Sequence, residues 1–285
     1  MKLSMSDFLK NIVILSMIAI SLFMVSKTCF AAQSEKQLDG IKTLEQDKVH
    51  KYDLNGDGKE EKIQYKTSVN DEKYTVSIQL YINDKLYMSR KDPGFHYTLQ
   101  LCDLDNSDNY LDLYGYATTD NACISYSFFA RYDENNQYNA IEFSLQNVAK
   151  HFETNRYSLE TLDGDGTFYF MIDTPIYSKA IGCYYCYVPF QLKNNKISPV
   201  AVKTYAFNKS SKKYKFKAAK KFSVYNKVSS KKVVYVVKKG EILSFNKLYV
   251  TKSGKAYFRI VNSKGKTGWM KSNQENLFVE HPTWG

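Results

Sequence analysis

Hydrophobic and polar residues alternate along much of the chain beyond residue 60. The clearest run is residues 73–82, where every second residue is Tyr, Val, Ile or Leu. A period of two is typical of a strand with one buried face. The same pattern predicts further strands at residues 62–72, 86–88, 97–101, 111–116, 123–130, 139–145, 168–173, 183–192 and 200–207. Only residues 146–155 indicate a helical turn, so the predicted fold class is all-β.

The C-terminal part of the chain has shorter strands and tighter turns. Five segments carry the pattern: residues 224–225, 233–237, 242–245, 247–250 and 256–261. Five short strands within about 60 residues, separated by glycine-containing turns, predict a small barrel.

Acidic loops interrupt the earlier strands. The first loop, residues 53–61, reads Asp-Leu-Asn-Gly-Asp-Gly-Lys-Glu-Glu. A hard cation such as calcium takes six to eight oxygen ligands from a flexible loop. The candidate ligands are Asp53, Asn55, Asp57, the carbonyl of Lys59, and Glu61. The flanking residues alternate as strands do, which excludes an EF-hand and indicates a strand–loop–strand site.

Two altered copies of this loop follow. The second loop, residues 103–112, supplies the candidate ligands Asp103, Asp105, Asp108 and Asp112. The third loop, residues 161–169, has Thr161 and Tyr169 where the first loop has acids. Asp57, Asp108 and Asp165 align at spacings of 51 and 57 residues, a period that indicates repeated small antiparallel sheets. Metal-free turns are the alternative, since Asp, Asn and Gly favour turns by themselves.

The first loop and the strand after it resemble the calcium loops of FG-GAP/VCBS-type repeats, which form the blades of integrin-like β-propellers. The resemblance covers residues 45–205 and implies a calcium cofactor. Three units are fewer than the roughly four to eight blades of a closed propeller. The F-G and G-A-P signatures are also absent. A partial propeller or a stack of β-meanders therefore fits the sequence as well as a closed ring does.

The N-terminus has the three-part pattern of a secretory signal peptide. Lys2 and Lys10 precede an apolar run from Ile12 to Val25, and small residues flank a cleavage point after Ala31. The run is shorter than the roughly 20 residues of a membrane span, although an uncleaved anchor is the alternative. We expect a secreted protein with no membrane association after cleavage. Richness in Lys, Asn, Tyr and Ile indicates an AT-rich, Gram-positive source.

Charge divides the mature chain into two parts. Residues 32–200 hold 17 Lys and Arg against 25 Asp and Glu, whereas residues 201–285 hold 20 against 3. The predicted organisation is a signal peptide (1–31), an acidic β-repeat domain (32–208), a basic linker (209–220) and a basic domain (221–285). A net charge of +17 on the last part predicts attraction to polyanions.

Residues 222–274 contain three distinctive motifs: Lys-Lys-Gly-Glu-Ile-Leu at 238–243, Tyr-Phe-Arg-Ile-Val at 257–261 and Gly-Lys-Thr-Gly-Trp-Met at 265–270. On these motifs the segment resembles a bacterial SH3 (SH3b) domain. The resemblance implies attachment to peptidoglycan or teichoic acid, and export argues against nucleic acid. The candidate binding residues are Tyr225, Tyr257, Arg259 and Trp269. For Tyr257 and Trp269, packing in the core is the alternative.

No catalytic constellation stands out. The four histidines have no metal spacing such as H-E-x-x-H, and no G-x-S-x-G elbow is present. Cys102, Cys123, Cys183 and Cys186 of the mature chain allow three disulfide pairings, and buried thiols are the alternative.

We therefore expect a cell-wall-associated binding protein, stabilised by calcium, whose acidic domain presents a surface to a protein partner or substrate. The alternatives are a secreted wall hydrolase with its catalytic site in residues 40–205, and a structural protein whose oppositely charged domains pack together.

Overall fold

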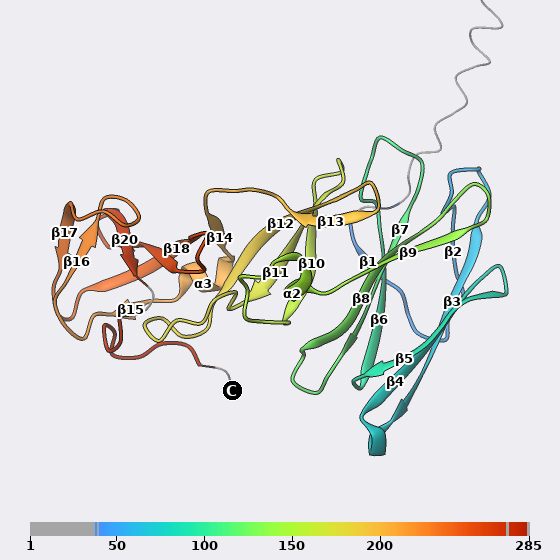
Figure 1. Ribbon diagram of the computed structural model, residues 1–285, viewed down its shortest axis with the longest axis horizontal. Helices are drawn as coiled ribbons and strands as arrows, with labels where there is room; N and C mark the ends of the chain where they lie inside the picture. The colour runs from blue at the N-terminus through green and yellow to red at the C-terminus, as the bar shows by residue number, and fades with distance from the viewer. Residues whose placement is uncertain (1–37, 39, 272–273, 284–285) are drawn as a thin grey trace, which may run out of the picture. The chain divides into compact units, whose positions relative to one another are not determined.

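The computed structural model describes residues 38, 40–271 and 274–283 (Figure 1). Twenty strands form three antiparallel sheets in these residues, and the helical segments are short. The prediction of an all-β fold is confirmed. Among the described residues none of the sheets closes into a barrel, so the small C-terminal barrel is not observed. The predicted signal peptide lies outside the described residues.

The first sheet has four strands, and each strand pairs with the next one along the chain. Its strands are β2 (His50–Tyr52), β3 (Glu61–Asn70), β4 (Thr75–Ile82) and β5 (Lys85–Pro93). The short 3-10 helix η1 (Asp71–Lys73) turns the chain from β3 into β4. In β4 the alternation seen in the sequence buries Val76, Ile78, Leu80 and Ile82 on one face.

The second sheet is buried on both faces. It contains β1 (Lys42–Thr43), β6 (His96–Cys102), β7 (Asp112–Thr118), β8 (Ile124–Tyr132) and β9 (Tyr138–Phe143). Consecutive residues of β7 point to opposite sides, so Leu113 packs against the first sheet while Tyr114 packs against the third. Phe128 and Phe129 of β8 divide in the same way. The near-continuous apolar runs of β7 and β8 follow from this double burial.

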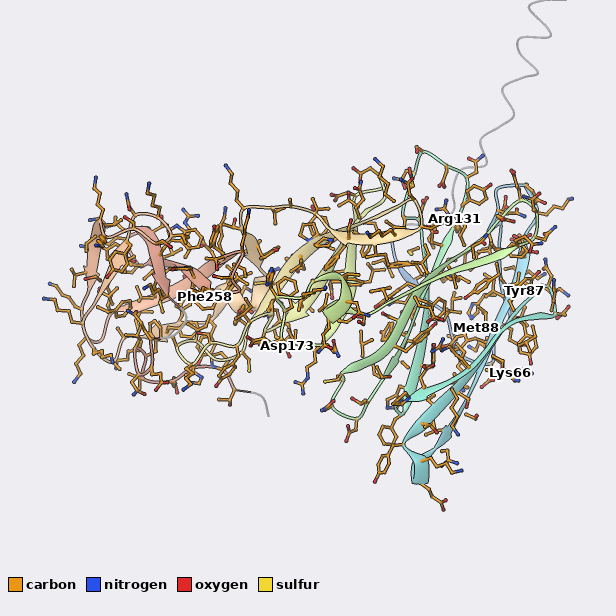
Figure 2. All side chains as sticks on the ribbon, in the orientation of Figure 1. Lys66, Tyr87, Met88, Arg131, Asp173 and Phe258 are labelled. Atoms are coloured by element: carbon orange, nitrogen blue, oxygen red, sulfur yellow. The ribbon has the colours of Figure 1, made fainter. Side chains whose placement is uncertain are left out.

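The contact between the first two sheets includes a group of tyrosines. The ring of Tyr87, on β5, lies 5.6 Å from that of Tyr132 and 6.0 Å from that of Tyr138, between ring centroids. Figure 2 labels Tyr87 and its neighbour Met88. The Tyr138 hydroxyl also contacts the Met88 sulfur at 3.9 Å.

The third sheet begins with another four strands in chain order, after the one-turn helix α2 (Leu145–Val148). These are β10 (Tyr157–Leu162), β11 (Thr167–Asp173), β12 (Tyr185–Lys193) and β13 (Lys196–Pro199). Phe168 and Phe170 of β11 face the second sheet. Their rings lie 5.0 Å from Phe129 and 5.9 Å from Tyr114, respectively.

The C-terminal strands continue the third sheet. They are β14 (Tyr205–Phe207), β15 (Phe216–Lys217), β16 (Phe222–Tyr225), β17 (Val233–Val237), β18 (Ile242–Val250), β19 (Ala256–Asn262) and β20 (Thr267–Lys271). β14 pairs with β12 on one side and with β18 on the other. The segment expected as a linker carries helix α3 (Lys209–Lys213), which is capped by the side chain of Asn208.

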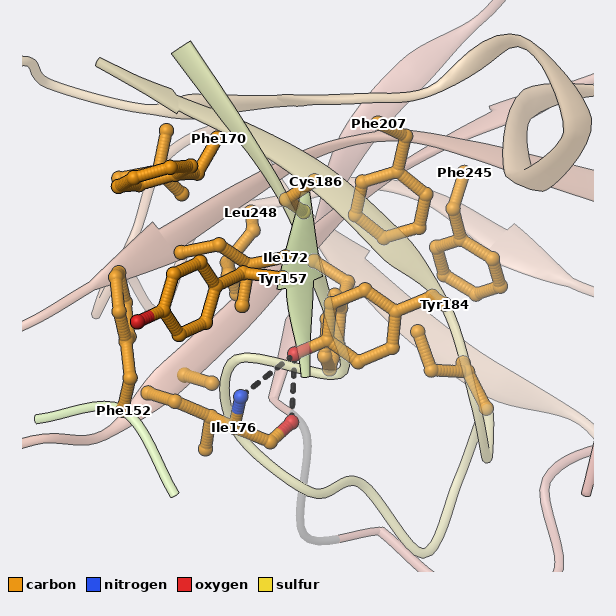
Figure 3. Close-up of a cluster of buried hydrophobic side chains, with 14 of the residues drawn as sticks. Phe152, Tyr157, Phe170, Ile172, Ile176, Tyr184, Cys186, Phe207, Phe245 and Leu248 are labelled. Atoms are coloured by element: carbon orange, nitrogen blue, oxygen red, sulfur yellow. Dashed lines mark hydrogen bonds between the residues drawn. The ribbon is translucent and has the colours of Figure 1, made fainter. Parts of the chain in front are cut away.

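One apolar cluster runs from the third four-strand unit into the C-terminal strands (Figure 3). The buried Tyr184 ring stacks on Phe207 at 5.0 Å and meets the edge of Phe258 at 5.2 Å. Its hydroxyl donates to the Ile176 carbonyl at 2.6 Å. A buried phenol needs such a partner, since an unpaired hydroxyl in this core would destabilise the fold.

Several elements differ from the sequence expectation: β1, β13, β15 and β20 were not predicted, and two further differences have a visible cause in the strand pairing. β10 was not anticipated, because a bulge between Leu159 and Thr161 interrupts its alternation. The two short strands expected at residues 242–245 and 247–250 form one strand, β18. A bulge between Phe245 and Lys247 shifts its register and produces the break in the pattern.

Candidate functional site

The three acidic loops occupy the same place in the three four-strand units. The first loop connects β2 to β3, the second connects β6 to β7, and the third connects β10 to β11. The aligned aspartates form the same turn. Oδ1 of Asp57, Asp108 and Asp165 accepts a hydrogen bond from the amide two residues later, at 2.8, 2.9 and 2.9 Å.

Backbone hydrogen bonds join the loops into a row. The Leu54 carbonyl of the first loop accepts from the Leu111 amide of the second at 3.0 Å. The Leu104 carbonyl of the second loop accepts from the Gly166 amide of the third at 2.7 Å. The repeat therefore brings together three loops that are far apart in the sequence. This row is one of two candidate functional sites.

In the first loop an acidic side chain is buried among other acids. Glu61 is 4% exposed, and its Oε2 accepts from the Leu54 amide at 2.8 Å. Burial raises the pKa of Glu61, and the nearby Asp57 and Asp53 raise it further. Asp53 accepts the amides of Asp57 and Gly58. Within the described residues Glu61 has no ion pair with a basic side chain.

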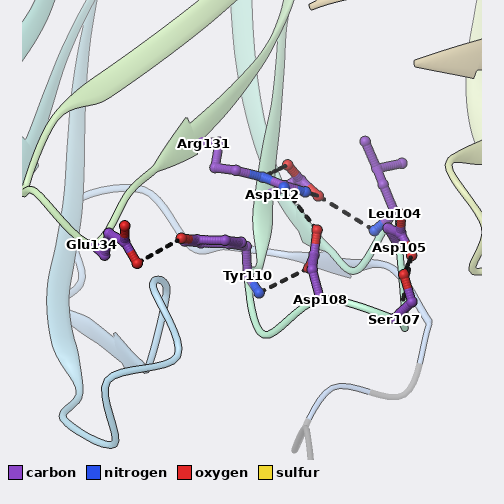
Figure 4. A network of polar contacts seen from close by, with 8 residues as sticks. All are labelled: Leu104, Asp105, Ser107, Asp108, Tyr110, Asp112, Arg131 and Glu134. Atoms are coloured by element: carbon purple, nitrogen blue, oxygen red, sulfur yellow. Dashed lines mark hydrogen bonds and ion pairs between the residues drawn. The ribbon is translucent and has the colours of Figure 1, made fainter. Parts of the chain in front are cut away.

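In the second loop an arginine compensates the buried acid (Figure 4). The Arg131 guanidinium donates to both carboxylate oxygens of Asp112 at 2.9 Å, and to Oδ2 of Asp108 at 2.8 Å. Asp112 is 1% exposed and corresponds to Glu61. Burial is the main cause of its raised pKa, and the arginine acts in the opposite direction. Sequence analysis did not identify Arg131 as part of this loop.

The third loop has a tyrosine where the others have the buried acid. The Tyr169 hydroxyl donates to Oδ2 of Asp163 at 3.1 Å. A neutral phenol thus stands where the first loop has Glu61, so the third loop has one carboxylate fewer to offer a cation.

The loops differ in how well they suit a metal. Among residues 38, 40–271 and 274–283, no three His, Cys, Asp or Glu side chains form a ready metal-binding group. The first loop supplies the oxygen donors that calcium prefers, including the buried and uncompensated Glu61. The second loop does not fit, because Asp108 and Asp112 already hold the guanidinium of Arg131.

The second candidate site is a pocket of about 490 Å³ on the C-terminal strands. It brings together three of the four residues expected to bind ligand: Tyr225, Tyr257 and Trp269. Tyr225 and Trp269 face each other across β16 and β20, and both are half-buried. Tyr257 is 7% exposed, with its hydroxyl 3.1 Å from that of Ser229.

Basic side chains surround this aromatic pocket. Lys227, Lys231 and Lys271 are exposed and line it. Sequence analysis did not single them out, although each is part of the basic C-terminal stretch. Arg259, the fourth expected residue, does not line the pocket. It pairs with Trp269 across β19 and β20 and donates to the Thr267 hydroxyl at 3.1 Å.

Two of the four described thiols are poorly suited to act as nucleophiles. Cys102 and Cys186 are free and buried, and burial raises the pKa of both thiols. A raised pKa disfavours the reactive thiolate. No disulfide joins any two of the four described cysteines, so none of the three pairings allowed by the sequence is formed among them.

The search for membrane-spanning segments gave a negative result: none of the helices in the described residues is both long and apolar enough to cross a bilayer.

Comparison with known proteins gives no relative: no family model, no curated protein and no solved structure matches this chain.

Proposed function

We propose that the protein is a secreted, cell-wall-associated binding protein that holds an anionic wall polymer, peptidoglycan or teichoic acid, in the aromatic pocket of its C-terminal strands. The observation that carries the proposal is the convergence of Tyr225, Tyr257 and Trp269 beneath a rim of lysines. Ligand sites commonly combine an apolar, aromatic lining with a few polar groups. The net charge of +17 on residues 201–285 attracts phosphate and carboxylate groups to that rim.

The finer architecture is part of the same proposal. We infer that the three four-strand units are propeller-like or meander repeats, and that residues 221–285 correspond to an SH3b-like module. The equivalent turns at Asp57, Asp108 and Asp165 support the first inference. The position of Gly268 and Trp269 in β20, within the pocket-bearing strands, supports the second.

Co-sedimentation with purified cell walls tests this function. The walls are used with and without their teichoic acids, across a salt series, and the bound fraction of the purified protein is measured. We expect binding that Trp269→Ala reduces at least tenfold. Tyr177→Ala is the matched control, because Tyr177 is an exposed aromatic outside the pocket.

The outcomes separate the ligands. Binding that survives salt and removal of teichoic acid indicates peptidoglycan. A different result is binding that is lost in salt or on removal of teichoic acid and is unchanged by Trp269→Ala. That result indicates attraction between a polycation and a polyanion that does not involve the pocket. Absence of binding contradicts the proposed function, and clearing of wall polymer in a zymogram would favour a hydrolase.

We further propose that calcium stabilises the first loop through Asp53, Asn55, Asp57, the Lys59 carbonyl and Glu61. The support is the burial of Glu61 beside Asp53 and Asp57 without a basic partner among the described residues. A divalent cation would offset this repulsion. Calcium is expected to raise the melting temperature of the protein, and identical melts in calcium and in EDTA would contradict the proposal.

A further inference from the structure

The first and second loops both place a buried acid, Glu61 and Asp112, at the start of the strand that follows, but these two acids have different surroundings. In the second unit the strand register pairs Asp112 with Arg131. In the first unit the pairing of β3 with β4 ends at Ile63 and Ile82, so Glu61 has no partner on β4, and Asp84 of the following turn pairs with Lys62. The described part of the first unit thus has no strand residue that compensates its buried acid as Arg131 does in the second unit.

The contacts of Arg131 are those of a bound cation. Its guanidinium bridges two carboxylates through three hydrogen bonds of 2.8 to 2.9 Å. Its free face lies over the Tyr110 ring, 4.9 Å from the centroid. The arginine side chain keeps its charge at any ordinary pH and cannot dissociate from the protein. Such a group does permanently what a metal ion would do only when bound.

We propose that Arg131 is a built-in cation that replaces a metal ion at the second loop, so that metal binding in the row of loops is confined to the first loop. The statement about the first loop rests on the proposed calcium site, whereas the role of Arg131 does not. Removal of the guanidinium would leave the oxygens of Asp108 and Asp112 around a space that a divalent cation can enter.

In this arrangement only the first loop of the row depends on a bound metal ion for its stability. The first loop contacts the second through the hydrogen bond from the Leu111 amide to the Leu54 carbonyl. The second loop is already held by Arg131 in the absence of any ion. Calcium would therefore order the first unit against a partner that is fixed in advance, and the remaining units would keep their structure when calcium is removed.

The test is a count of bound cations on the full protein. Terbium serves as the probe, because tyrosines excite its luminescence at short range and Tyr110 adjoins the site. Isothermal titration with calcium gives the stoichiometry. We expect one ion on the native protein and two on Arg131→Gln, the second bound at least tenfold more tightly than any second ion on the native protein.

Arg90→Gln is the matched control. Arg90 also forms a bidentate pair, with both oxygens of Asp92 at 2.7 Å, but it does so within one strand, β5, and not in an acidic loop. This variant should bind the same number of ions as the native protein. If Arg90→Gln gained as many bound ions as Arg131→Gln, any unpaired carboxylate would attract the probe, and the proposal would be overturned.

Other outcomes are equally decisive. If the native protein binds no ion and Arg131→Gln binds one, the calcium site in the first loop is wrong while the role of Arg131 is upheld. An unchanged count in Arg131→Gln overturns that role. Should Arg131→Gln be unfolded without ions, millimolar calcium must restore its circular dichroism spectrum, and failure to do so also overturns the proposal.

Discussion

The first and second loops form a natural comparison, because the same turn and the same buried acid occur in both. Glu61 and Asp112 each accept a hydrogen bond from the amide of the buried leucine in their loop, at 2.8 and 3.4 Å. Arg131 compensates Asp112, whereas Glu61 lies beside Asp53 and Asp57. A repeat can therefore keep its backbone while changing how its charge is balanced.

The difference shows why the acidic motif alone does not define a metal site. Desolvation makes a buried carboxylate costly unless a cation is paired with it. A protein can supply that cation from its own chain or take it from solution. In the second loop the chain supplies the cation itself, as Arg131. For the first loop we expect a cation taken from solution.

Removal of the internal cation should have the largest effect on stability. Arg131→Gln leaves Asp112 buried without its partner, and breaking a buried pair in this way costs about 3 kcal/mol of unfolding free energy. Urea denaturation at pH 7 measures the loss. The control Asp84→Asn, in the turn between β4 and β5, should cost far less, because it breaks an ion pair in which Asp84 is 83% exposed in its side chain.

The pH dependence of that loss gives an independent check. Burial raises the pKa of Asp112, and the carboxyl becomes neutral as pH falls through that raised value. The folded variant then binds a proton that the unfolded chain releases, so the penalty of Arg131→Gln should shrink on acidification. A penalty that is constant between pH 7 and pH 4 would indicate lost packing and not an unpaired charge.

Disturbing the contact between the first and second loops should cause the next largest loss of stability. A side chain at Gly56 would lie 2.8 Å from the Asn109 carbonyl oxygen, and the backbone there has a φ of +72°. Gly56→Ala must therefore separate the loops and strain the turn, at about 2 to 3 kcal/mol. Gly58→Ala is the control. Its φ is +84° and nothing lies within 4 Å, so only the backbone strain of about 1 kcal/mol remains.

Equal losses from the two glycine changes, measured by the same denaturation, would mean that the first and second loops do not depend on each other. Calcium should partly restore the stability of Gly58→Ala but not that of Gly56→Ala, because only Gly56→Ala displaces the neighbouring loop.

Most of the strands and the acidic loops could be predicted from the sequence, because each leaves a local pattern, and three of the four expected binding residues line one pocket. It missed Arg131, which is 19 residues from Asp112 in the chain and meets it only through the register of β7 and β8. The pattern of one strand contains no information about which residue of the next strand lies opposite. For the same reason the sequence does not reveal that Arg259, expected to bind ligand, lies outside the pocket and donates to the Thr267 hydroxyl.

A smaller effect, of opposite sign, is expected at Glu61. Burial and the neighbouring acids raise its pKa, so the charged carboxylate destabilises the metal-free fold and stability should rise as pH falls through that pKa. Glu61→Gln keeps an acceptor for the Leu54 amide and removes the charge. We expect a higher melting temperature than native in EDTA, no further rise with calcium, and a weaker pH dependence below neutrality.

Asp112→Asn is the contrasting variant, because it removes an acid that already has its cation. It should lower the melting temperature, since Arg131 then loses its bidentate partner. If both variants were stabilising, Arg131 would not be compensating Asp112, and the contrast between the loops would disappear.

The smallest expected effect concerns the ring that holds Arg131 in place. Tyr110 lies under the guanidinium in the second loop, whereas the aligned residue of the first loop is Lys59. A cation–π contact at a partly exposed position contributes about 0.5 to 1 kcal/mol. Tyr110→Leu keeps much of the apolar contact and should cost about that amount. A double-mutant cycle with Arg131→Gln isolates the part due to the guanidinium. Coupling near zero would mean that the ring only fills space, and that the two carboxylates alone position the arginine. Coupling of the expected size would show that the second loop has a complete cation site of its own, with Asp112 and Asp108 on one side of the charge and Tyr110 on the other.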